Sequence, residues 1–179
     1  MSSNRIGVNR IGVNRIGVNR IGVNRIALNR ISNKRLRVNL DSAGELLATD
    51  EGREVFSLAM SCALDADTTL VATIEGNDFE FAGEIGLATH WLDHPLDAVG
   101  QGWVTACMIA RANANEVAIP ISMRGPHKGL ETTSDERETF PLEEGAFFGN
   151  LFGPLDEPNP WYACRGRAQA KGEYGGLVE

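Results

Sequence analysis

The sequence lacks any long hydrophobic run. Its apolar stretches are short and interrupted, well below the roughly 18 consecutive residues that a membrane-spanning helix requires, so no membrane span is predicted. The first residues, MSSNRIGV, also contain no apolar segment of the kind found in secretory signal peptides. Two expectations stay open: a cytoplasmic protein, or a protein whose leader lies outside this sequence.

Motifs for cofactor and metal binding are also missing. Neither GxGxxG nor GxxxxGK[ST] occurs, so a phosphate-cradling loop is not predicted. The three cysteines, Cys62, Cys107 and Cys164, lie far apart with no CxxC spacing. This pattern supports neither a zinc ribbon nor a thioredoxin-type redox motif. No cofactor is therefore predicted.

Acidic residues are absent from the first 37 positions. That stretch holds nine Lys or Arg, whereas residues 38–179 hold eight basic and 24 acidic residues, a formal charge of −16 against −7 for the whole chain. Such a split predicts a basic arm that docks on an acidic surface of its own chain or of a neighbour, or that meets an anionic partner. The apolar content of 42% is that of a folded globular protein.

The arm is a repeat. NRIGV occurs four times in tandem from Asn4 to Val23 and then decays through NRIAL, NRISN and KRLRV. A five-residue period fits neither the 3.6-residue turn of a helix nor the two-residue alternation of a strand. The repeated isoleucines, which we name as candidate assembly residues of the arm, are Ile6, Ile11, Ile16, Ile21 and Ile26.

Three interpretations of the arm stay open. It can be a flexible product of coding-DNA duplication, a strand that adds to a sheet edge in another subunit, or an arm that meets an anionic partner such as nucleic acid. Nucleic acid is the least favoured partner because the arm has no aromatic residue for base stacking and the body is acidic. We expect residues 1–36 to form the arm and residues 37–179 to form one globular domain.

Helical and strand-like patterns alternate irregularly along residues 37–179. Helices are predicted from Asp41 through Leu47, from a cap at Asp50 through Ala63, and from Val99 or Gln101 to Asn113. The second helix has an apolar face at Val55, Phe56, Ala59, Met60, Cys62 and Ala63; the third carries Trp103, Ala106, Cys107 and Ala110 on one side.

Strands are predicted at residues 68–74 and 79–88, around a turn at 75–78, and at 117–122, 145–153 and 161–168. Pro120 favours an edge strand or a bulge, because proline cannot donate to a ladder. Residues 90–97 and 125–144 are predicted to be loops. This order indicates an α+β fold, with helices packed on one face of a mainly antiparallel sheet and an N-terminal repeat arm.

Several segments together resemble a known pattern. WVTAC, ISMRG, EGAFFGNLF and WYACRG, with SCAL upstream, resemble a family of uncharacterised bacterial proteins of the cell envelope, over about residues 40–168. The resemblance implies a single domain and an extracellular or cell-envelope location, and it carries no activity. Because cysteines of exported proteins tend to pair, it also implies a disulfide between Cys62 and Cys107, with Cys164 left over.

Candidate catalytic and metal-binding residues are few. His90 and His94 lie four apart with Asp93 between them, and His127 could complete a three-histidine metal site. Cys107 with a histidine and Asp93 or Asp97 would supply the parts of a thiol hydrolase. The simpler interpretation is that the histidines face water and that Cys107 is a buried structural cysteine.

Charged and aromatic residues offer weaker candidates. Glu143–Glu144 and Asp135–Glu136 could act as acid and base, although adjacent acids in a polar loop are usually solvated. Arg124, Arg165 and Arg167 follow strand-like runs and could clamp a carboxylate or phosphate; pairing with neighbouring acids is the more common role. The aromatic residues Phe147, Phe148, Phe152, Trp161 and Tyr162 are predicted to fill the core.

These observations favour a non-enzymatic structural or binding protein of the cell surface that self-associates through its arm by strand addition. Two alternatives remain: a metal- or cysteine-dependent hydrolase, and an arm that binds an anionic partner such as nucleic acid.

Overall fold

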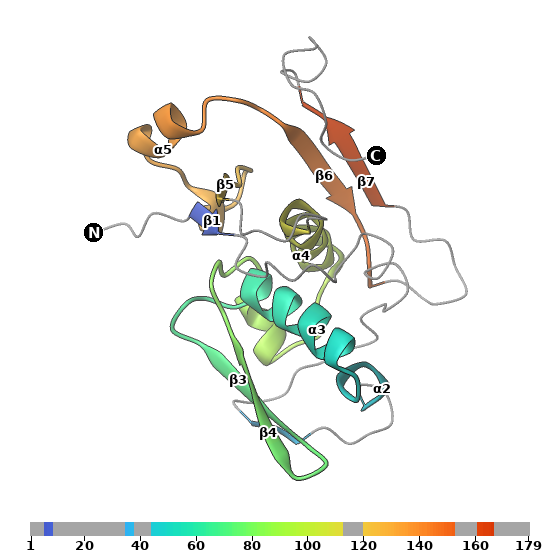
Figure 1. The fold of residues 1–179 in the computed structure, drawn as a ribbon. Helices are drawn as coiled ribbons and strands as arrows, with labels where there is room; N and C mark the ends of the chain where they lie inside the picture. The colour runs from blue at the N-terminus through green and yellow to red at the C-terminus, as the bar shows by residue number, and fades with distance from the viewer. Residues whose placement is uncertain (1–5, 9–34, 38–43, 113–119, 153–160, 167–179) are drawn as a thin grey trace.

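Helix α3 (Asp50–Ala63) lies at the centre of the computed structural model, which describes residues 6–8, 35–37, 44–112, 120–152 and 161–166 (Figure 1). Thr49 is its N-cap and accepts a hydrogen bond from the amide of Gly52 at 3.0 Å. Asp50, predicted as the cap, is the first helical residue, where its charge favours the helix dipole. The predicted apolar face is confirmed, since all six of its residues are buried. The short helix α2 (Gly44–Leu47) precedes it.

Helix α4 (Ala98–Arg111) packs against α3. Asp97 caps it by accepting from the amide of Gly100 at 2.7 Å. Of the four residues predicted to share one side of this helix only Cys107 is buried, and Val104 and Met108 are buried beside it. The inward face therefore follows positions 104, 107 and 108, which keep helical spacing, and Trp103 is left half-buried on the flank.

The predicted hairpin is confirmed as strands β3 (Thr69–Ile74) and β4 (Asn77–Ala82), with Thr69 opposite Ala82 and Ile74 opposite Asn77. Its two-residue turn places both Glu75 (φ 51°) and Gly76 (φ 83°) in the left-handed region, as tight hairpin turns require. Strand β2 (Arg35–Arg37) pairs in parallel with the other edge of β3. Arg35 and Leu36, which the sequence assigned to the arm, thus take part in this sheet.

The second strand ends six residues earlier than predicted, because the chain leaves the sheet to close the end of α3. The amides of Ile85, Leu87 and Ala88 donate to the carbonyls of Ser61, Cys62 and Ala63 at 2.9–3.0 Å. These carbonyls lie in the last helical turn, where the helix offers no internal partner. The chain then forms a short 3₁₀ helix, η1 (Thr89–Leu92), which overlaps the first predicted loop, residues 90–97.

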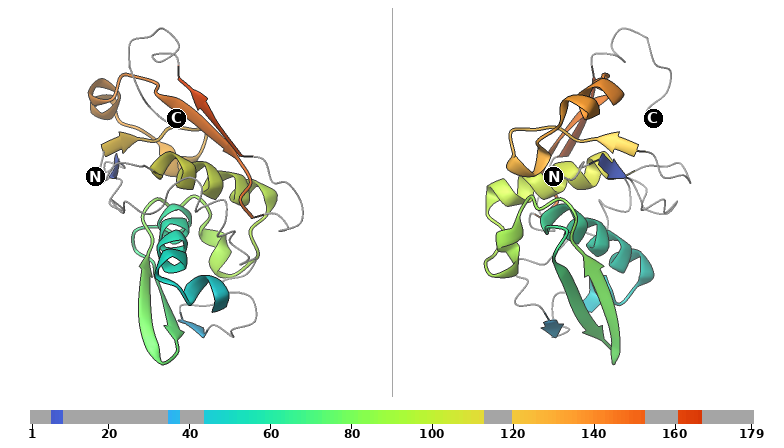
Figure 2. Two further views of the ribbon diagram at one scale, coloured as in Figure 1. Left: turned by 45° about the vertical axis from the view of Figure 1, so that its right-hand side comes forward. Right: turned by 90° about the vertical axis from the view of Figure 1, so that its left-hand side faces the viewer.

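The remaining elements lie on the far side of α4. They are β5 (Pro120–Ser122), η2 (Lys128–Leu130), α5 (Ser134–Thr139), β6 (Gly145–Gly149) and β7 (Trp161–Arg165). Strands β6 and β7 form an antiparallel pair that packs on α4, and β1 (Ile6–Val8) pairs antiparallel with β5. Figures 1 and 2 show the β3–β4 hairpin at one end of the molecule and β6–β7 at the other, with α3 and α4 between.

The α+β class is confirmed, with helices packed against strands. The described strands divide into three small sheets, ordered β1–β5, β2–β3–β4 and β6–β7. Pairing is antiparallel except between β2 and β3. The predicted strand positions 117–119 lie outside the described residues, and within the described residues Pro120 stands in a two-stranded sheet.

The second predicted loop, 125–144, was wrong in part, since it contains η2 and α5. The signal was present in the sequence: Thr133 stands three residues before Glu136, the spacing of a helix-starting capping box. Thr133 is the N-cap of α5 and accepts from the amide of Glu136 at 3.1 Å.

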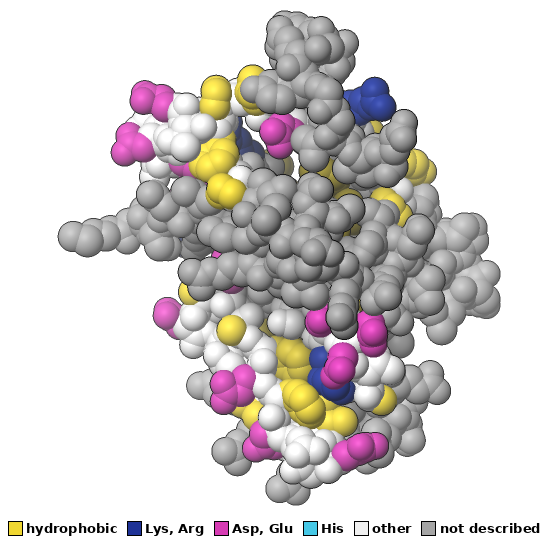
Figure 3. All heavy atoms as spheres, viewed as in Figure 1, with side chains coloured by type: hydrophobic (Ala, Val, Ile, Leu, Met, Phe, Trp, Pro, Cys, Tyr) yellow, Lys and Arg dark blue, Asp and Glu magenta, His cyan; other side chains and the backbone are white. Residues whose placement is uncertain are grey.

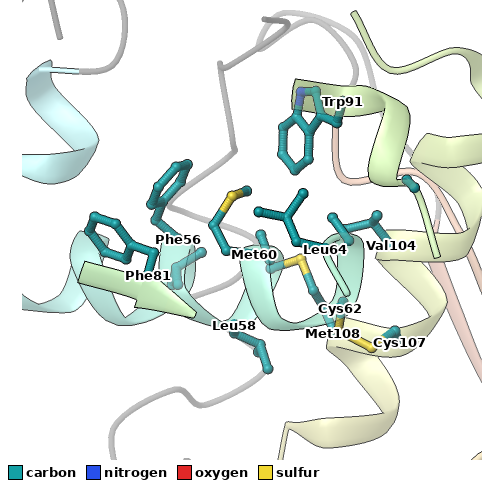
Figure 4. Packing of buried hydrophobic residues seen from close by; sticks show 14 of the residues in the cluster. Phe56, Leu58, Met60, Cys62, Leu64, Phe81, Trp91, Val104, Cys107 and Met108 are labelled. Carbon is teal, nitrogen blue, oxygen red and sulfur yellow. A yellow bond between two sulfur atoms is a disulfide. The ribbon is translucent and has the colours of Figure 1, made fainter. Parts of the chain in front are cut away.

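The core surrounds α3 (Figure 4). Phe56 of α3 meets Phe81 of β4 edge to face, with ring centroids 4.7 Å apart. Trp91 of η1 is fully buried and packs against Phe152 at 5.5 Å. Cys62 and Cys107 form the disulfide that the resemblance implied, with Cα atoms 6.0 Å apart. Among the described residues, no helix is long and apolar enough to cross a membrane.

Reduction of the Cys62–Cys107 disulfide is expected to lower the free energy of unfolding by about 2–4 kcal/mol, because the bond closes a loop with a sequence separation of 45. Urea unfolding with and without a thiol reductant measures the effect. The double variant Cys62→Ala/Cys107→Ala should match the reduced protein to within the cost of the lost sulfur contacts. Cys164→Ala is the control and should change stability by less than about 0.5 kcal/mol. An unchanged urea midpoint after complete reduction would contradict the expectation.

Candidate functional site

The candidate metal ligands do not form a cluster. Nε2 of His90 lies 4.0 Å from Oδ1 of Asp97, and both side chains are largely exposed. His94 and Asp93 are exposed beside them. Within the described parts of the chain, no group of three or more His, Cys, Asp or Glu side chains is placed to hold a metal ion.

His127 has a structural position elsewhere. Its Nδ1 accepts a hydrogen bond from the amide of Gly129 at 2.9 Å, which caps η2. Its ring lies 5.2 Å from the ring of Trp103. The turn also brings backbone close to that indole, because a Cβ atom on Gly125 would lie 2.9 Å from Trp103 Cζ3. Trp103 and His127 thus anchor the segment after β5 onto α4.

The cysteine candidate is excluded as a nucleophile in this structure. The Cys107 sulfur is bonded to Cys62 and has no thiolate to offer. Cys164 is an exposed free thiol on β7.

The acidic and basic candidates differ in their exposure to solvent. Glu143, Glu144 and Asp135 are exposed, whereas Glu136 is only 4% exposed, so the prediction that these acids are all solvated was wrong for Glu136. Arg165 is exposed on β7. Arg167 lies outside the described residues. Two of the aromatic residues predicted to fill the core, Phe148 and Tyr162, are 50% exposed and stack across β6 and β7 with centroids 5.0 Å apart.

Glu136 belongs to a polar network that supports β5. Ser122 Oγ donates to Glu136 Oε1 at 2.7 Å and accepts from Arg124 Nε at 3.1 Å. Arg124 Nη2 donates to the carbonyl oxygen of Phe140 at 2.7 Å. The network therefore joins the end of β5 to both ends of α5. The sequence hypothesis of an arginine clamp placed Arg124 near a strand end, but its described partners belong to this chain.

A second polar network holds α3 and α4 together. Arg111 is 2% exposed, and its guanidinium donates to Ser61 Oγ at 2.8 Å and to Glu84 Oε2 at 2.7 Å. A buried charge is tolerated where it is paired and hydrogen-bonded. Arg111 therefore has a structural role, since its guanidinium binds two side chains of the same fold.

An open depression lies between α3 and β4, and Figure 3 shows a basic side chain bordered by acidic and apolar ones over these elements. Arg53 pairs with Asp50 and places its guanidinium 4.6 Å from the centre of the Phe79 ring. Glu54, Ser57 and Glu80 complete the polar lining. The depression holds no nucleophile paired with a base.

The first repeat unit of the arm joins the body through the β1–β5 pairing. Ile6, Gly7 and Val8 of the first repeat stand opposite Ser122, Ile121 and Pro120 in antiparallel register. The body therefore presents β5 as an edge that receives a strand. The Ser122–Glu136 hydrogen bond holds this strand, and the Trp103 contact holds the segment that follows it. The sequence indicated an edge strand at Pro120 and strand addition by the arm; the missing information was which edge the arm meets.

Comparisons with known proteins give no further direction: no family model, curated protein or solved structure matches this chain.

Replacement of Ser122 by alanine is expected to lower the free energy of unfolding by about 1–3 kcal/mol, because it leaves the buried Glu136 carboxylate without this hydrogen-bond donor. Urea unfolding measures the change, provided that the dependence of the free energy of unfolding on urea concentration is the same in both proteins. Ser134→Ala is a matched control, since Ser134 is exposed at the start of α5. Equal effects of the two substitutions would show that the network does not support β5.

Proposed function

We propose that this chain is a non-enzymatic structural or binding protein of the cell surface that associates with other copies of itself through strand addition by its N-terminal arm. One observation carries the proposal: a unit of the repeat pairs with an edge strand of the body, as strand addition requires. In the structure both strands belong to one chain. The same backbone pairing is available to an arm from a second copy, as in domain swapping.

Charge supports this assignment. Residues 1–37 carry nine basic residues and no acid, and residues 38–179 carry a formal charge of −16. Attraction between arm and body raises the rate at which an arm finds either its own body or a neighbour's. A polyanion such as nucleic acid would meet the arm but be repelled by the body, so the acidic body of another copy is the better partner.

The described residues favour a binding role over an enzymatic one. The hydrolase alternative drew on Cys107, which is in a disulfide, and on histidines that do not converge with further ligands in the described part of the chain. The disulfide is compatible with an extracellular location, because such bonds persist in oxidising compartments.

Removal of residues 1–33 is expected to yield a monomer, while the full chain shows a larger, concentration-dependent mass in light scattering coupled to size exclusion. The cut is placed before β2 because Arg35–Arg37 pair with β3, whereas removal of the whole arm, residues 1–36, would break that pairing. Higher salt should shift the full chain toward the monomer.

Two controls accompany this experiment. Intact mass should show that the truncated chain keeps its disulfide, and thermal unfolding should show that it is folded. If the full and truncated chains both run as monomers, or if they assemble equally, self-association through the arm is wrong.

A further inference from the structure

We infer that β5 is an acceptor for any one of the four identical I-G-V units of the arm, and that the first unit is one of four equivalent ligands for it. This inference rests on the proposed function for its role in assembly, and it names the two binding partners: an I-G-V tripeptide in extended conformation and the Pro120–Ser122 edge.

The register supports this equivalence. Ile6, Gly7 and Val8 stand opposite Ser122, Ile121 and Pro120. A shift of the arm by five residues brings Ile11, Gly12 and Val13 to the same three partners, and further shifts do so for residues 16–18 and 21–23. Each of these pairings is chemically the same, so the contacts across the two strands cannot distinguish the units. Only the length of chain that connects each unit to the body differs.

Shifts other than multiples of five do not preserve the fit. Gly7 stands opposite Ile121, which is half-buried. Glycine in a strand permits close approach of a neighbour, and a shift by one residue would replace it there with Ile or Val. The repeat therefore offers four discrete positions on β5 instead of a continuous slide. The next unit, Ile26-Ala27-Leu28, departs from the pattern at two of its three positions.

Docking of one unit is expected to be weak and exchangeable. The pairing spans three residues, and Pro120 contributes no N–H donor. A two-stranded ribbon of this kind is marginal in water by itself. Four equivalent units multiply the equilibrium constant for docking on β5 by up to four on statistical grounds, and a unit not used in its own chain is available to the β5 edge of another copy.

The four positions differ in the length of chain that connects each unit to β2. Residues 9–34 connect the first unit to β2, which is 26 residues, whereas residues 24–34 would connect the fourth, which is 11. Eleven residues reach up to about 36 Å when extended.

Disulfide trapping in the full chain tests this equivalence. Val8 stands opposite Pro120, whose side chain is exposed, and Cα atoms of opposed antiparallel residues lie about 4.5–5.5 Å apart, within the range of a disulfide. In a Cys164→Ser background, Pro120→Cys is combined in turn with Val8→Cys, Val13→Cys, Val18→Cys and Val23→Cys. Peptide mapping then measures the bonded fraction. Arg15→Cys with Pro120→Cys is the control, since Arg15 has similar reach but lies outside every I-G-V register.

We expect all four valine positions to crosslink and the Arg15 control to give a yield at least tenfold below each of them. Crosslinking at position 8 alone, at none of the four, or equally at position 15 would overturn the inference. A second series with Ile121→Cys and cysteines at Gly7, Gly12, Gly17 and Gly22 repeats the test at the adjacent pair, in case Pro120→Cys disturbs β5.

Mixing separates this inference from the proposed function. One chain carries Val13→Cys and the other Pro120→Cys, both with Cys164→Ser, and a bond between positions 13 and 120 reports docking between copies. Bonds within one chain at all four positions, without bonds between chains, would support the equivalence and refute self-association. Arm-dependent assembly with crosslinking only at position 8 would support self-association and refute the equivalence of the four units.

Discussion

The contact between the C-terminal half of α3 and α4 is the constraint on which the rest of the structure depends. Three kinds of interaction meet there: the Cys62–Cys107 bond, the buried Arg111 bridge to Ser61 and Glu84, and the amides of residues 85–88 that satisfy the last carbonyls of α3. The β3–β4 hairpin is positioned by the hydrogen bonds that the chain after it makes to the end of α3. The β6–β7 pair is positioned by its packing on α4. Each half of the molecule therefore takes its position from this junction.

Local patterns in the sequence predicted the elements that bury one face. The six apolar positions of α3 and the β3–β4 hairpin are confirmed, because a buried helix face leaves a periodic pattern and a hairpin leaves two strand-like runs around a turn. Helix α4 was harder, since its alanines and glycines are compatible with any face. The end of β4 and the position of Glu136 depend on partners distant in sequence, at Ser61–Ala63 and at Ser122. No local signal specifies such partners.

The candidate sites also depend on partners that are distant in sequence. The disulfide followed from the resemblance and is confirmed. The histidine, carboxylate and arginine candidates were selected by residue type and spacing, and the fold places His127, Glu136 and Arg124 in structural hydrogen bonds instead. Spacing along the chain could identify an arm and an edge strand separately. Their pairing is a feature of the tertiary structure, because a five-residue repeat does not specify which residues it pairs with.

The disulfide also has a consequence for how the protein withstands damage. The tight turn at Glu75 and Gly76 is exposed, and it lies between the two bonded cysteines in sequence. A protease that cleaves this turn would break the polypeptide and still leave both fragments covalently joined across α3 and α4. In a protease-rich environment such a molecule persists as a nicked but unseparated body, and the arm remains attached to it.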